Sequence, residues 1–504
     1  MAPILRAIRQ QAAADAGRTA LSFDGQTCAY GPLADRVARV AAWLAGQGVR
    51  PGQVVALMMG NSAAFVEIAV AVNALGAIYL PVNTRLAPPE AEWILRHSGA
   101  SLLIADDDLA ASAPAADVIL DAAARRDIAG AFGLSAGAFD AVVLAPGDPF
   151  RIMYTSGTTG RPKGVIHTAG NFAWKLLDQI AVLPLGRGDR ILVCGPLFHV
   201  GGADLPGLGI LALGGELHIQ RGVDADRILA TIAEAGITGL WLAPAMLARL
   251  IDHGGVAGGA LHWCIGGGER TPERRIRDFE RLFPTARYVD SYGMTETCSG
   301  DTFMPAGWEI DRIGSVGIAA PNIRIRICDD DGRDLPAGTD GEICLRGPKV
   351  TPGYWRDPDR TAEAFRDGWL RSGDIGHLDA DGFLTLTDRR KDMIISGGEN
   401  ISPGEIERVL LMHPDLAEAA VIGVPDATWG ERPLAFVVAR PRTAPAPDAL
   451  LRHCAAHLAR FKLPGRILIM ADLPRNASGK VMKHLLRARP ENSADTTDTR
   501  GSDA

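Results

Sequence analysis

Short hydroxyl side chains, glycines and a single lysine occur together in one uninterrupted run of the chain. The run is Tyr154-Thr155-Ser156-Gly157-Thr158-Thr159-Gly160-Arg161-Pro162-Lys163-Gly164, and the apolar stretch that leads into it, Arg151–Tyr154, is typical of a strand. Glycine lets backbone N–H groups approach an anion, hydroxyl groups add short donors and lysine adds positive charge. We therefore expect a flexible loop that binds a polyphosphate.

Other interpretations of this loop are weaker. A surface linker rich in Ser, Thr and Gly has no need of the ending Pro162-Lys163-Gly164. A P-loop requires Gly-Lys-Ser/Thr at the start of a helix, and Lys163 stands between proline and glycine instead. Elsewhere, Gly207-Leu208-Gly209 resembles part of a dinucleotide-binding loop but lacks the third glycine.

The elements that must position this loop alternate between short apolar runs and longer amphipathic ones. The alternation fills the first hundred residues and returns after residue 190, which predicts a layered α/β domain with a largely parallel sheet. The expected strands are Val54–Met59, Ala77–Pro81, Leu102–Ile104, Ile191–Cys194, Glu216–Ile219 and Gly239–Leu242, and the expected helices are Leu33–Leu44, Ala63–Leu75 and Pro89–His97.

From about Gly314 the pattern changes to strands and turns, which predicts an all-β subdomain. Asp-Gly pairs are typical of hairpin turns, and four occur here: Asp331-Gly332, Asp340-Gly341, Asp367-Gly368 and Asp381-Gly382. The charged stretch Asp388–Asp392 is expected to be a linker. A small α+β domain should follow, with helices Pro403–Leu411 and Asp448–Leu458 and strands Ala419–Val424, Leu434–Val438 and Ile467–Ile469.

Composition limits the classes of partner. A net charge of -7 gives no electrostatic reason to expect nucleic acid or an anionic membrane surface. None of the seven cysteines forms a CxxC pair, which disfavours zinc and disulfide frameworks and fits a cytoplasmic protein. The most apolar stretch, Ala63–Val82, is interrupted by Glu67, Asn73 and Gly76, so we expect a buried helix and strand and no integral membrane segment.

The run from Tyr154 resembles the signature of the adenylate-forming superfamily, which includes acyl-CoA synthetases, adenylation domains and luciferases. Further matches follow in the family's order along nearly the whole chain: Pro196–His199, Gly266–Glu269, Tyr292–Thr297, Gly353–Trp355, Ser372–Asp374, Asp388–Asp392, Ser396–Asn400 and Pro474–Lys480. The resemblance implies a large N-terminal domain of layered α/β sheets plus a β subdomain (residues 1–390). It also implies a small mobile α+β C-terminal domain (391–490), and the polar tail 491–504 is expected to be disordered.

The resemblance implies a reaction whose obstacle is electrostatic. A carboxylate is already ionised at pH 7, but it must approach the α-phosphate of ATP while pyrophosphate leaves, so cations and donors are needed around phosphorus. The implied phosphate and metal residues are the loop Thr155, Ser156, Gly157, Thr158, Thr159 and Gly160 with Lys163, then Thr295 for the α-phosphate, Glu296 for Mg²⁺ and Lys480 between carboxylate and α-phosphate. Taken alone, Glu296 and Lys480 would be ordinary surface charges.

The same resemblance assigns an adenosine site. The residues implied around adenine and ribose are Gly267, Gly268, Glu269, Asp290, Tyr292, Gly293, Asp374 and Arg389. Tyr292 would stack on the adenine, Asp290 would bind its amino group, and Asp374 and Arg389 would contact the ribose. Taken alone, Asp374 in Ser-Gly-Asp would be a turn residue.

The second step implied is transfer of the acyl group to the thiol of coenzyme A. The family rotates its C-terminal domain about a hinge between the two steps, and that hinge maps to Lys391. Coenzyme A would then meet Gly397, Gly398, Phe461, Lys462 and Arg466; the alternative for Phe461 is a core residue beneath the C-terminal sheet. An enzyme that loads a separate carrier protein is the alternative.

The acid itself is the least defined part of the prediction. The expected pocket residues are Trp241, His199, Val200, Gly201 and Gly266, with His199 as a gate; Trp241 and His199 could instead be core residues. No cationic residue stands out nearby to pair with a second carboxylate, which favours a hydrophobic monocarboxylic acid, fatty, cyclic or aromatic. The small-molecule partners are this acid and coenzyme A; the assembly state is open, with a homodimer as one option.

Overall fold

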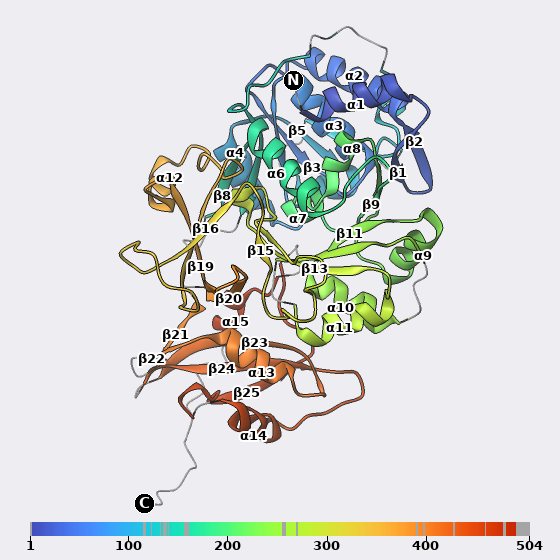
Figure 1. Cartoon of the computed structure of the whole chain (residues 1–504). Coiled ribbons are helices and arrows are strands. Elements are labelled where there is room, and N and C mark those ends of the chain that lie inside the picture. Colours follow the sequence, from blue (N-terminus) through green and yellow to red (C-terminus); the bar gives the residue numbers. More distant parts are fainter. Residues whose placement is uncertain are drawn as a thin grey trace, which may run out of the picture. The chain divides into compact units, whose positions relative to one another are not determined.

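The computed structural model divides the chain into two units. The N-terminal unit is Met1–Ser372 with His377–Leu386, and the C-terminal unit is Gly373–Gly376 with Thr387–Ala504 (Figure 1). The expected boundary between residues 390 and 391 lies outside the described residues and stays a prediction. The structure describes residues 3–113, 117–121, 123–131, 133–134, 139, 141–155, 161–254, 259–268, 271–389, 392–396, 399–426, 429–458, 460–476 and 480–489.

The first sheet of the N-terminal unit has the strand order β6-β5-β3-β4-β7-β8. All its neighbouring strands are parallel except the final hairpin, β7 with β8. Parallel strands are covered on both faces, which is why Val54–Met58 is buried at every position. The strands are β3 (Val54–Met58), β4 (Ile78–Pro81), β5 (Ala100–Asp106), β6 (Val118–Leu120), β7 (Pro149–Thr155) and β8 (Lys163–Thr168).

The second sheet has the strand order β15-β14-β13-β12-β11-β9-β10-β1-β2. Its central strands are parallel, so their carboxyl ends meet at one edge, where α/β sheets bind ligands. The strands are β1 (Thr19–Phe23), β2 (Gln26–Ala29), β9 (Arg190–Val193), β10 (Glu216–Ile219), β11 (Gly239–Leu242), β12 (Trp263–Gly266), β13 (Arg287–Tyr292), β14 (Thr302–Phe303) and β15 (Ile318–Ala319).

Helices cover both sheets, and α3 is buried on every side because it is apolar all round. Helix α6 is the reverse of an ordinary surface helix: Trp174 and Leu177 are exposed, while Lys175 and Asp178 are buried in ion pairs. The helices are α1 (Pro3–Ala14), α2 (Tyr30–Gly46), α3 (Ala63–Ala74), α4 (Pro88–Ser98), α5 (Ile128–Ala131), α6 (Ala169–Val182), α7 (Val200–Asp204), α8 (Ile210–Leu213), α9 (Ala225–Ala235), α10 (Pro244–His253) and α11 (Glu273–Leu282), with 3-10 turns η1 (Asp107–Ser112), η2 (Gly207–Gly209) and η3 (Thr295–Thr297).

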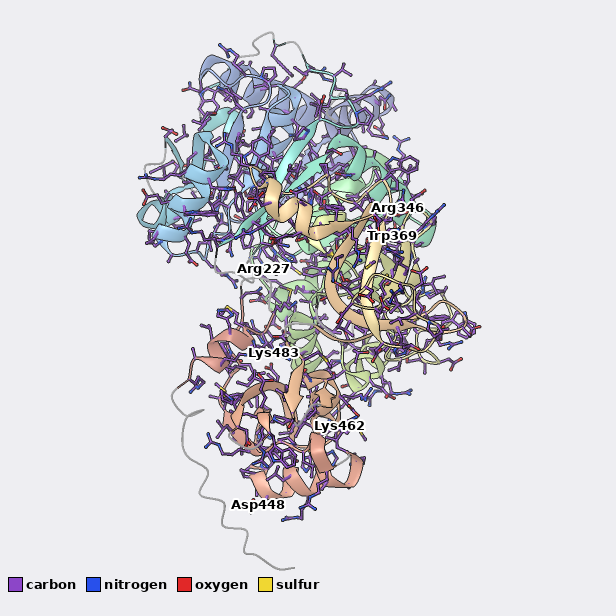
Figure 2. The ribbon with its side chains drawn as sticks, turned by 90° about the vertical axis from the view of Figure 1, so that its left-hand side faces the viewer. Arg227, Arg346, Trp369, Asp448, Lys462 and Lys483 are labelled. Carbon is purple, nitrogen blue, oxygen red and sulfur yellow. The ribbon has the colours of Figure 1, made fainter. Side chains whose placement is uncertain are left out.

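The segment after Gly314 is mainly β but contains one helix, α12 (Pro358–Ala364), that the turn-rich pattern did not predict. Asp367 and Gly368 form the expected tight turn, both with positive φ, whereas Gly341 begins a strand. Arg346 and Trp369 face each other across this sheet, with the guanidinium 6.0 Å from the ring centre (Figure 2). The strands are β16 (Arg324–Cys328), β17 (Gly341–Arg346), β18 (Phe365–Arg366), β19 (Trp369–Leu378) and β20 (Leu384–Arg389).

The structure excludes one alternative interpretation in this region and corrects one prediction. Asp374 lies within strand β19 and not in a turn, although the preceding Gly373 has a positive φ of 74°. The expected linker begins too early, because Asp388 and Arg389 complete strand β20, which pairs with β19. In both cases pairing with neighbouring strands of the sheet outweighs the local turn and linker preference of polar residues.

The C-terminal unit is a sheet with helices on both faces. Side chains alternate along β23 and β24, so Val421 and Ala435 pack with α13 and α14 while Ile422 and Phe436 pack toward α15. The sheet order is β22-β21-β24-β23, with β25 beside β24. The elements are β21 (Ile394–Ser396), β22 (Glu399–Ile401), α13 (Pro403–Leu411), β23 (Leu416–Asp426), β24 (Gly430–Ala439), α14 (Pro447–His457), η5 (Arg460–Lys462), β25 (Arg466–Met470) and α15 (Lys483–Arg487).

These elements confirm the expected fold class, a large layered α/β unit with a β subdomain and a small α+β unit. The expected strands and helices are all present, with ends that shift by a few residues. Among the described residues, no helix has both the length and the apolar character needed to cross a bilayer. The polar tail 491–504 lies outside the described residues.

Candidate active site

The expected polyphosphate loop connects the two strands of the β7/β8 hairpin, in which Thr155 pairs with Lys163. A strand therefore follows the loop, which confirms that it is not a P-loop. Ser156, Gly157, Thr158, Thr159 and Gly160 lie outside the described residues, so their role stays a prediction. The buried hydroxyl of Thr155 has no hydrogen-bond partner among the residues that the structure describes, which suits a site that receives an anion.

Lys163, Glu296 and Tyr354 form a closed triangle of polar contacts. The Lys163 ammonium lies 2.6 Å from Oε1 of Glu296, and the Tyr354 hydroxyl donates to the same oxygen at 2.9 Å. Lys163 also donates to the Tyr354 hydroxyl at 2.7 Å and lies 4.4 Å from the ring centre. The structure thus joins the predicted phosphate-binding lysine to the predicted metal-binding carboxylate.

Tyr354 is a site residue that the sequence prediction missed. Burial raises the pKa of its hydroxyl well above the ordinary value, and the nearby Glu296 carboxylate raises it further. The hydroxyl therefore remains protonated at neutral pH and can donate to Glu296. The signal was present, since Gly353-Tyr354-Trp355 is one of the matched motifs, but the aromatic side chain had been given no role.

Glu296 and Thr295 are fixed on the short turn η3. Glu296 is 3% exposed, and its carbonyl oxygen accepts from the backbone N–H of Thr351 at 2.7 Å. The described residues contain no group of three or more His, Cys, Asp or Glu that could hold a metal. One carboxylate on a rigid turn fits Mg²⁺, which usually takes one or two carboxylates together with substrate phosphates and water.

The predicted adenine residues stand at the carboxyl ends of neighbouring strands β12 and β13, where Gly266 pairs with Asp290. Gly268 has a φ of +93°, and no atom of the described residues outside its own chain neighbours lies within 4 Å of the place where a Cβ would stand, so a ligand could approach the backbone here. Asp290 and Tyr292 are buried, at 4% and 6% exposure.

The remaining predicted adenosine residues are less informative. Gly293 is tightly packed, because an added Cβ would meet the backbone of Ser299 and Gly300. Asp374 is buried on β19, at 8% exposure. Glu269 and the side chain of Arg389 lie outside the described residues. All adenosine contacts remain predictions.

Trp241 is the centre of the predicted acid-binding residues. Its indole stacks on the His199 imidazole, with ring centres 6.1 Å apart and planes 27° apart. Added Cβ atoms at Gly195 and Gly201 would collide with the indole ring, so these glycines make room for it. The buried indole N–H has no hydrogen-bond partner among the described residues, and it lies beside Gly267.

Val200 and Gly266 differ in their surroundings. Val200 packs with Ala203 and with Met153 of the β7/β8 hairpin, which carries the expected polyphosphate loop and is called the phosphate hairpin below. Gly266 alternates with Ile265, the strand partner of Trp241, so it faces the other side of the sheet. A Cβ at Gly266 would overlap the Tyr288 hydroxyl, which gives this glycine a packing role. Its place in the acid site stays a prediction.

The C-terminal residues predicted for catalysis and coenzyme A lie in the second unit. The backbone N–H of Lys480 donates to the Asn476 side chain at 2.8 Å. Lys462, which is labelled in Figure 2, forms an ion pair with Glu405 at 2.7 Å. Arg466 begins β25. Lys391, Gly397, Gly398 and the side chain of Phe461 lie outside the described residues.

Comparison with known proteins identifies the family. Residues 8–355 match the model for the AMP-binding enzyme and residues 405–480 match the AMP-binding enzyme C-terminal domain. The chain is 37% identical to an indoleacetate–CoA ligase of Aromatoleum aromaticum, over 95% of this chain and 96% of that protein. It is 36% identical to a feruloyl-CoA synthase of an Amycolatopsis species, over 94% of this chain and 96% of that protein.

The structure agrees with this assignment. It superposes on the O-succinylbenzoate coenzyme A synthetase of Bacillus subtilis in complex with ATP and magnesium ion, with a TM-score of 0.86, 30% identity, and coverage of 95% of this chain and 98% of that one. These relatives disfavour loading of a carrier protein. The chain belongs to the AMP-binding enzyme family, and within it to the AMP-forming acid–CoA ligases, which use ATP, Mg²⁺ and coenzyme A.

Proposed function

We propose that this ligase activates a monocarboxylic acid that carries an aromatic or cyclic group. The observation that carries the proposal is the stacked pair of Trp241, near the carboxyl end of β11, and His199, which caps α7. Flat aromatic surfaces favour a flat partner, because ring pairs in stacked or edge-to-face contact gain energy beyond the area that they bury. Names of relatives support the same class, since one acts on indoleacetate and another forms feruloyl-CoA.

The unpartnered indole N–H narrows the proposed substrate further. A buried donor without an acceptor costs about 1–3 kcal/mol, so an acid that supplies an acceptor near Trp241 would gain affinity. Ring acids with a carbonyl, hydroxyl or ether oxygen therefore fit better than unsubstituted ones.

The proposed course of adenylation assigns each residue a task. Lys163 and the expected polyphosphate loop would bind the β- and γ-phosphates. Glu296 would hold Mg²⁺, and Thr295 would contact the α-phosphate. Lys480 would offset the negative charge between carboxylate and phosphate as they approach. Lys163 and Glu296 contact each other in the structure, and with Mg–ATP bound each side chain would instead have an oppositely charged partner, phosphate for Lys163 and the metal for Glu296.

An acid panel tests the proposed substrate class. Pyrophosphate release and thioester formation would be measured with arylacetic, cinnamic and cyclic acids and with straight-chain fatty acids of equal carbon number. We expect higher kcat/KM for the ring acids, and Trp241→Leu should reduce this preference. Trp263→Leu is the matched control, because Trp263 is a fully buried tryptophan of the neighbouring strand β12. Preference for straight-chain acids, or a uniform fall in activity for Trp241→Leu, would replace this proposal with a fatty-acid ligase.

The cytoplasm is the proposed location. All seven cysteines lie within the described residues and are buried and unpaired, which agrees with a reducing compartment. Cell fractionation would test this location. The homodimer option and the expected absence of nucleic acid remain predictions, which sedimentation with and without nucleic acid would check.

A further inference from the structure

One face of the phosphate hairpin holds the turn η3 at two points. Opposite residues of an antiparallel pair share a face, and Lys163 and His167 are separated by four positions on β8, so both lie on that face. Lys163 contacts the Glu296 side chain at 2.6 Å. The His167 Nε2 atom lies 2.7 Å from the carbonyl oxygen of Thr295.

The tautomer of His167 follows from its other neighbour. Arg151, its strand partner, places Nε at 3.0 Å and Nη2 at 2.7 Å from the His167 Nδ1 atom. A guanidinium only donates, so Nδ1 must accept and the ring proton must be on Nε2. The imidazole therefore donates to the carbonyl of Thr295. Burial, and then the charge of Arg151, lower the pKa of His167 to about 3, so the ring is neutral in the working pH range.

Arg151 is held in turn by a carboxylate from the acid site's helix. It is ion-paired through Nη2 with Asp204, and its Nη1 donates to Oδ1 of Asp204 at 3.2 Å. Arg151, His167 and Asp204 all have 0% exposure. Asp204 is the last residue of α7, and His199 caps the first turn of the same helix. A buried chain of contacts thus runs from α7 through Arg151 and His167 to η3.

We propose that His167 is a positioning residue for adenylation, which fixes the turn bearing Thr295 and Glu296 and, through Arg151 and Asp204, couples this turn to the acid-binding helix α7. The inference rests on the proposed roles of Thr295 and Glu296. A backbone shift of about 1 Å at reacting groups can cost roughly 100-fold in rate. A shift of α7 when the acid binds would be transmitted through these contacts to Thr295 and Glu296, the residues proposed to bind the α-phosphate and Mg²⁺.

Two amide replacements separate positioning from packing. His167→Asn offers its oxygen to Arg151 but is too short to reach the Thr295 carbonyl. His167→Gln is longer and can donate to that carbonyl. Both keep a polar group against the buried guanidinium, so both should fold. Tyr79→Phe is the control, because it removes a different contact of Arg151, the 3.2 Å bond from Nη1 to the Tyr79 hydroxyl.

The two half-reactions would be measured separately for all variants. For His167→Asn we expect kcat/KM for Mg–ATP in pyrophosphate release to fall about 10- to 100-fold. Thioester formation from a synthetic acyl-adenylate should change less than about threefold, and His167→Gln should recover most of the lost activity. Tyr79→Phe should resemble the wild type.

Equal activity of the Asn and Gln variants would overturn the inference, as would an equal fall in both half-reactions. The wild type in the same assay keeps this outcome distinct from failure of the proposed function. If the wild type makes thioester from ring acids while the His167 variants behave alike, only the positioning role fails. If the wild type makes none, the proposed function fails.

Discussion

The Nζ atom of Lys163 lies 2.6 Å from Oε1 of Glu296, although the two residues are separated by 133 positions in the sequence. The ammonium is partly exposed and the carboxylate is buried, so the pair is reachable by a ligand from the lysine side. With Mg–ATP bound, the metal would replace the ammonium as the partner of Glu296, and phosphate would replace the carboxylate as the partner of Lys163. The contact therefore gives a direct way to test the assignment of the phosphate and metal site.

Replacing Glu296 with glutamine should weaken the Mg²⁺ site while preserving its shape. The amide is a poorer ligand for a hard cation, so the half-saturating Mg²⁺ concentration should rise about 10- to 100-fold. Mg²⁺ titration of pyrophosphate release at saturating ATP measures this shift. Glu309→Gln is a control at another partly buried carboxylate, which pairs with Arg287 and has no predicted metal role. An unchanged Mg²⁺ requirement in Glu296→Gln would remove this residue from the metal site.

Tyr354→Phe should have a smaller effect on the same site. It removes the hydroxyl that donates to Glu296 at 2.9 Å and receives Lys163 at 2.7 Å, but it keeps the ring. With Mg–ATP bound, Lys163 would pair with phosphate, so the bond lost in that complex is the one to Glu296. Such a bond is worth about 0.5–1.5 kcal/mol, so kcat/KM for Mg–ATP should fall about two- to tenfold. Thioester formation from a pre-made acyl-adenylate shows whether the effect is confined to adenylation. A larger loss in this step than in pyrophosphate release would contradict the assignment.

Glu67 should make stability depend on pH. Burial raises the pKa of its carboxyl to about 7 from 4.5, against the opposing pull of Arg36, whose Nη2 lies 2.9 Å away. In the window between these values the folded chain binds more protons than the unfolded chain. The stabilising contribution is therefore present below pH 4.5 and is lost as the pH rises to about 7.

The corresponding variant is Glu67→Gln, which mimics the neutral carboxyl at every pH. At about 1.4 kcal/mol per pKa unit, the wild type should lose up to about 3 kcal/mol across the window relative to this variant. Urea denaturation at pH 5 and pH 7.5 measures the difference. Glu92→Gln, at an exposed ion pair on α4, should leave the pH dependence unchanged. Parallel pH profiles for the wild type and Glu67→Gln would show that Glu67 does not titrate in this range.

Much of this arrangement could be predicted from the sequence because it depends on local patterns. Strands such as Gly239–Leu242 and helices such as Pro403–Leu411 are bounded by turn and cap residues, and the structure has them at the predicted positions. The predicted hydroxyl- and glycine-rich loop likewise follows a strand, β7, as expected. The spacing of apolar residues and the turn or cap residues at the ends of an element are properties of neighbouring residues, so one sequence is enough to show them.

The missed features depend on residues that are distant in sequence. Tyr354 reaches Glu296 only because its segment runs beside β8, where Val165 bridges to Tyr354. Arg151 looked like part of an apolar strand, and its partner Asp204 follows a glycine-rich stretch. Their pairing in the protein interior could not be inferred from either segment alone. For Gly266, the sequence could not show that Tyr288 fills the space beside it.

Glu405 should limit the affinity for coenzyme A through its ion pair with Lys462. Glu405→Gln should free the ammonium and lower the apparent KM for coenzyme A about two- to fivefold, since an exposed pair is worth about 0.2–1 kcal/mol. Lys462→Met should raise that KM, and pyrophosphate release should be unaffected in both variants. Glu407→Gln is the matched control, because Glu407 lies on α13 like Glu405 but pairs with Lys483 of α15, which is labelled in Figure 2. If all three variants have the wild-type KM, Lys462 does not contact coenzyme A.

Lys480→Ala tests most directly whether the chain first activates its acid on ATP and then transfers it to coenzyme A. The two half-reactions would be followed by rapid quench, one as pyrophosphate release without coenzyme A and the other as thioester formation from a synthetic acyl-adenylate. Loss of a positioned cation should slow the first about 100-fold or more, while the second changes by less than about tenfold. An equal fall in both half-reactions, or pyrophosphate release at the wild-type rate, would contradict the account.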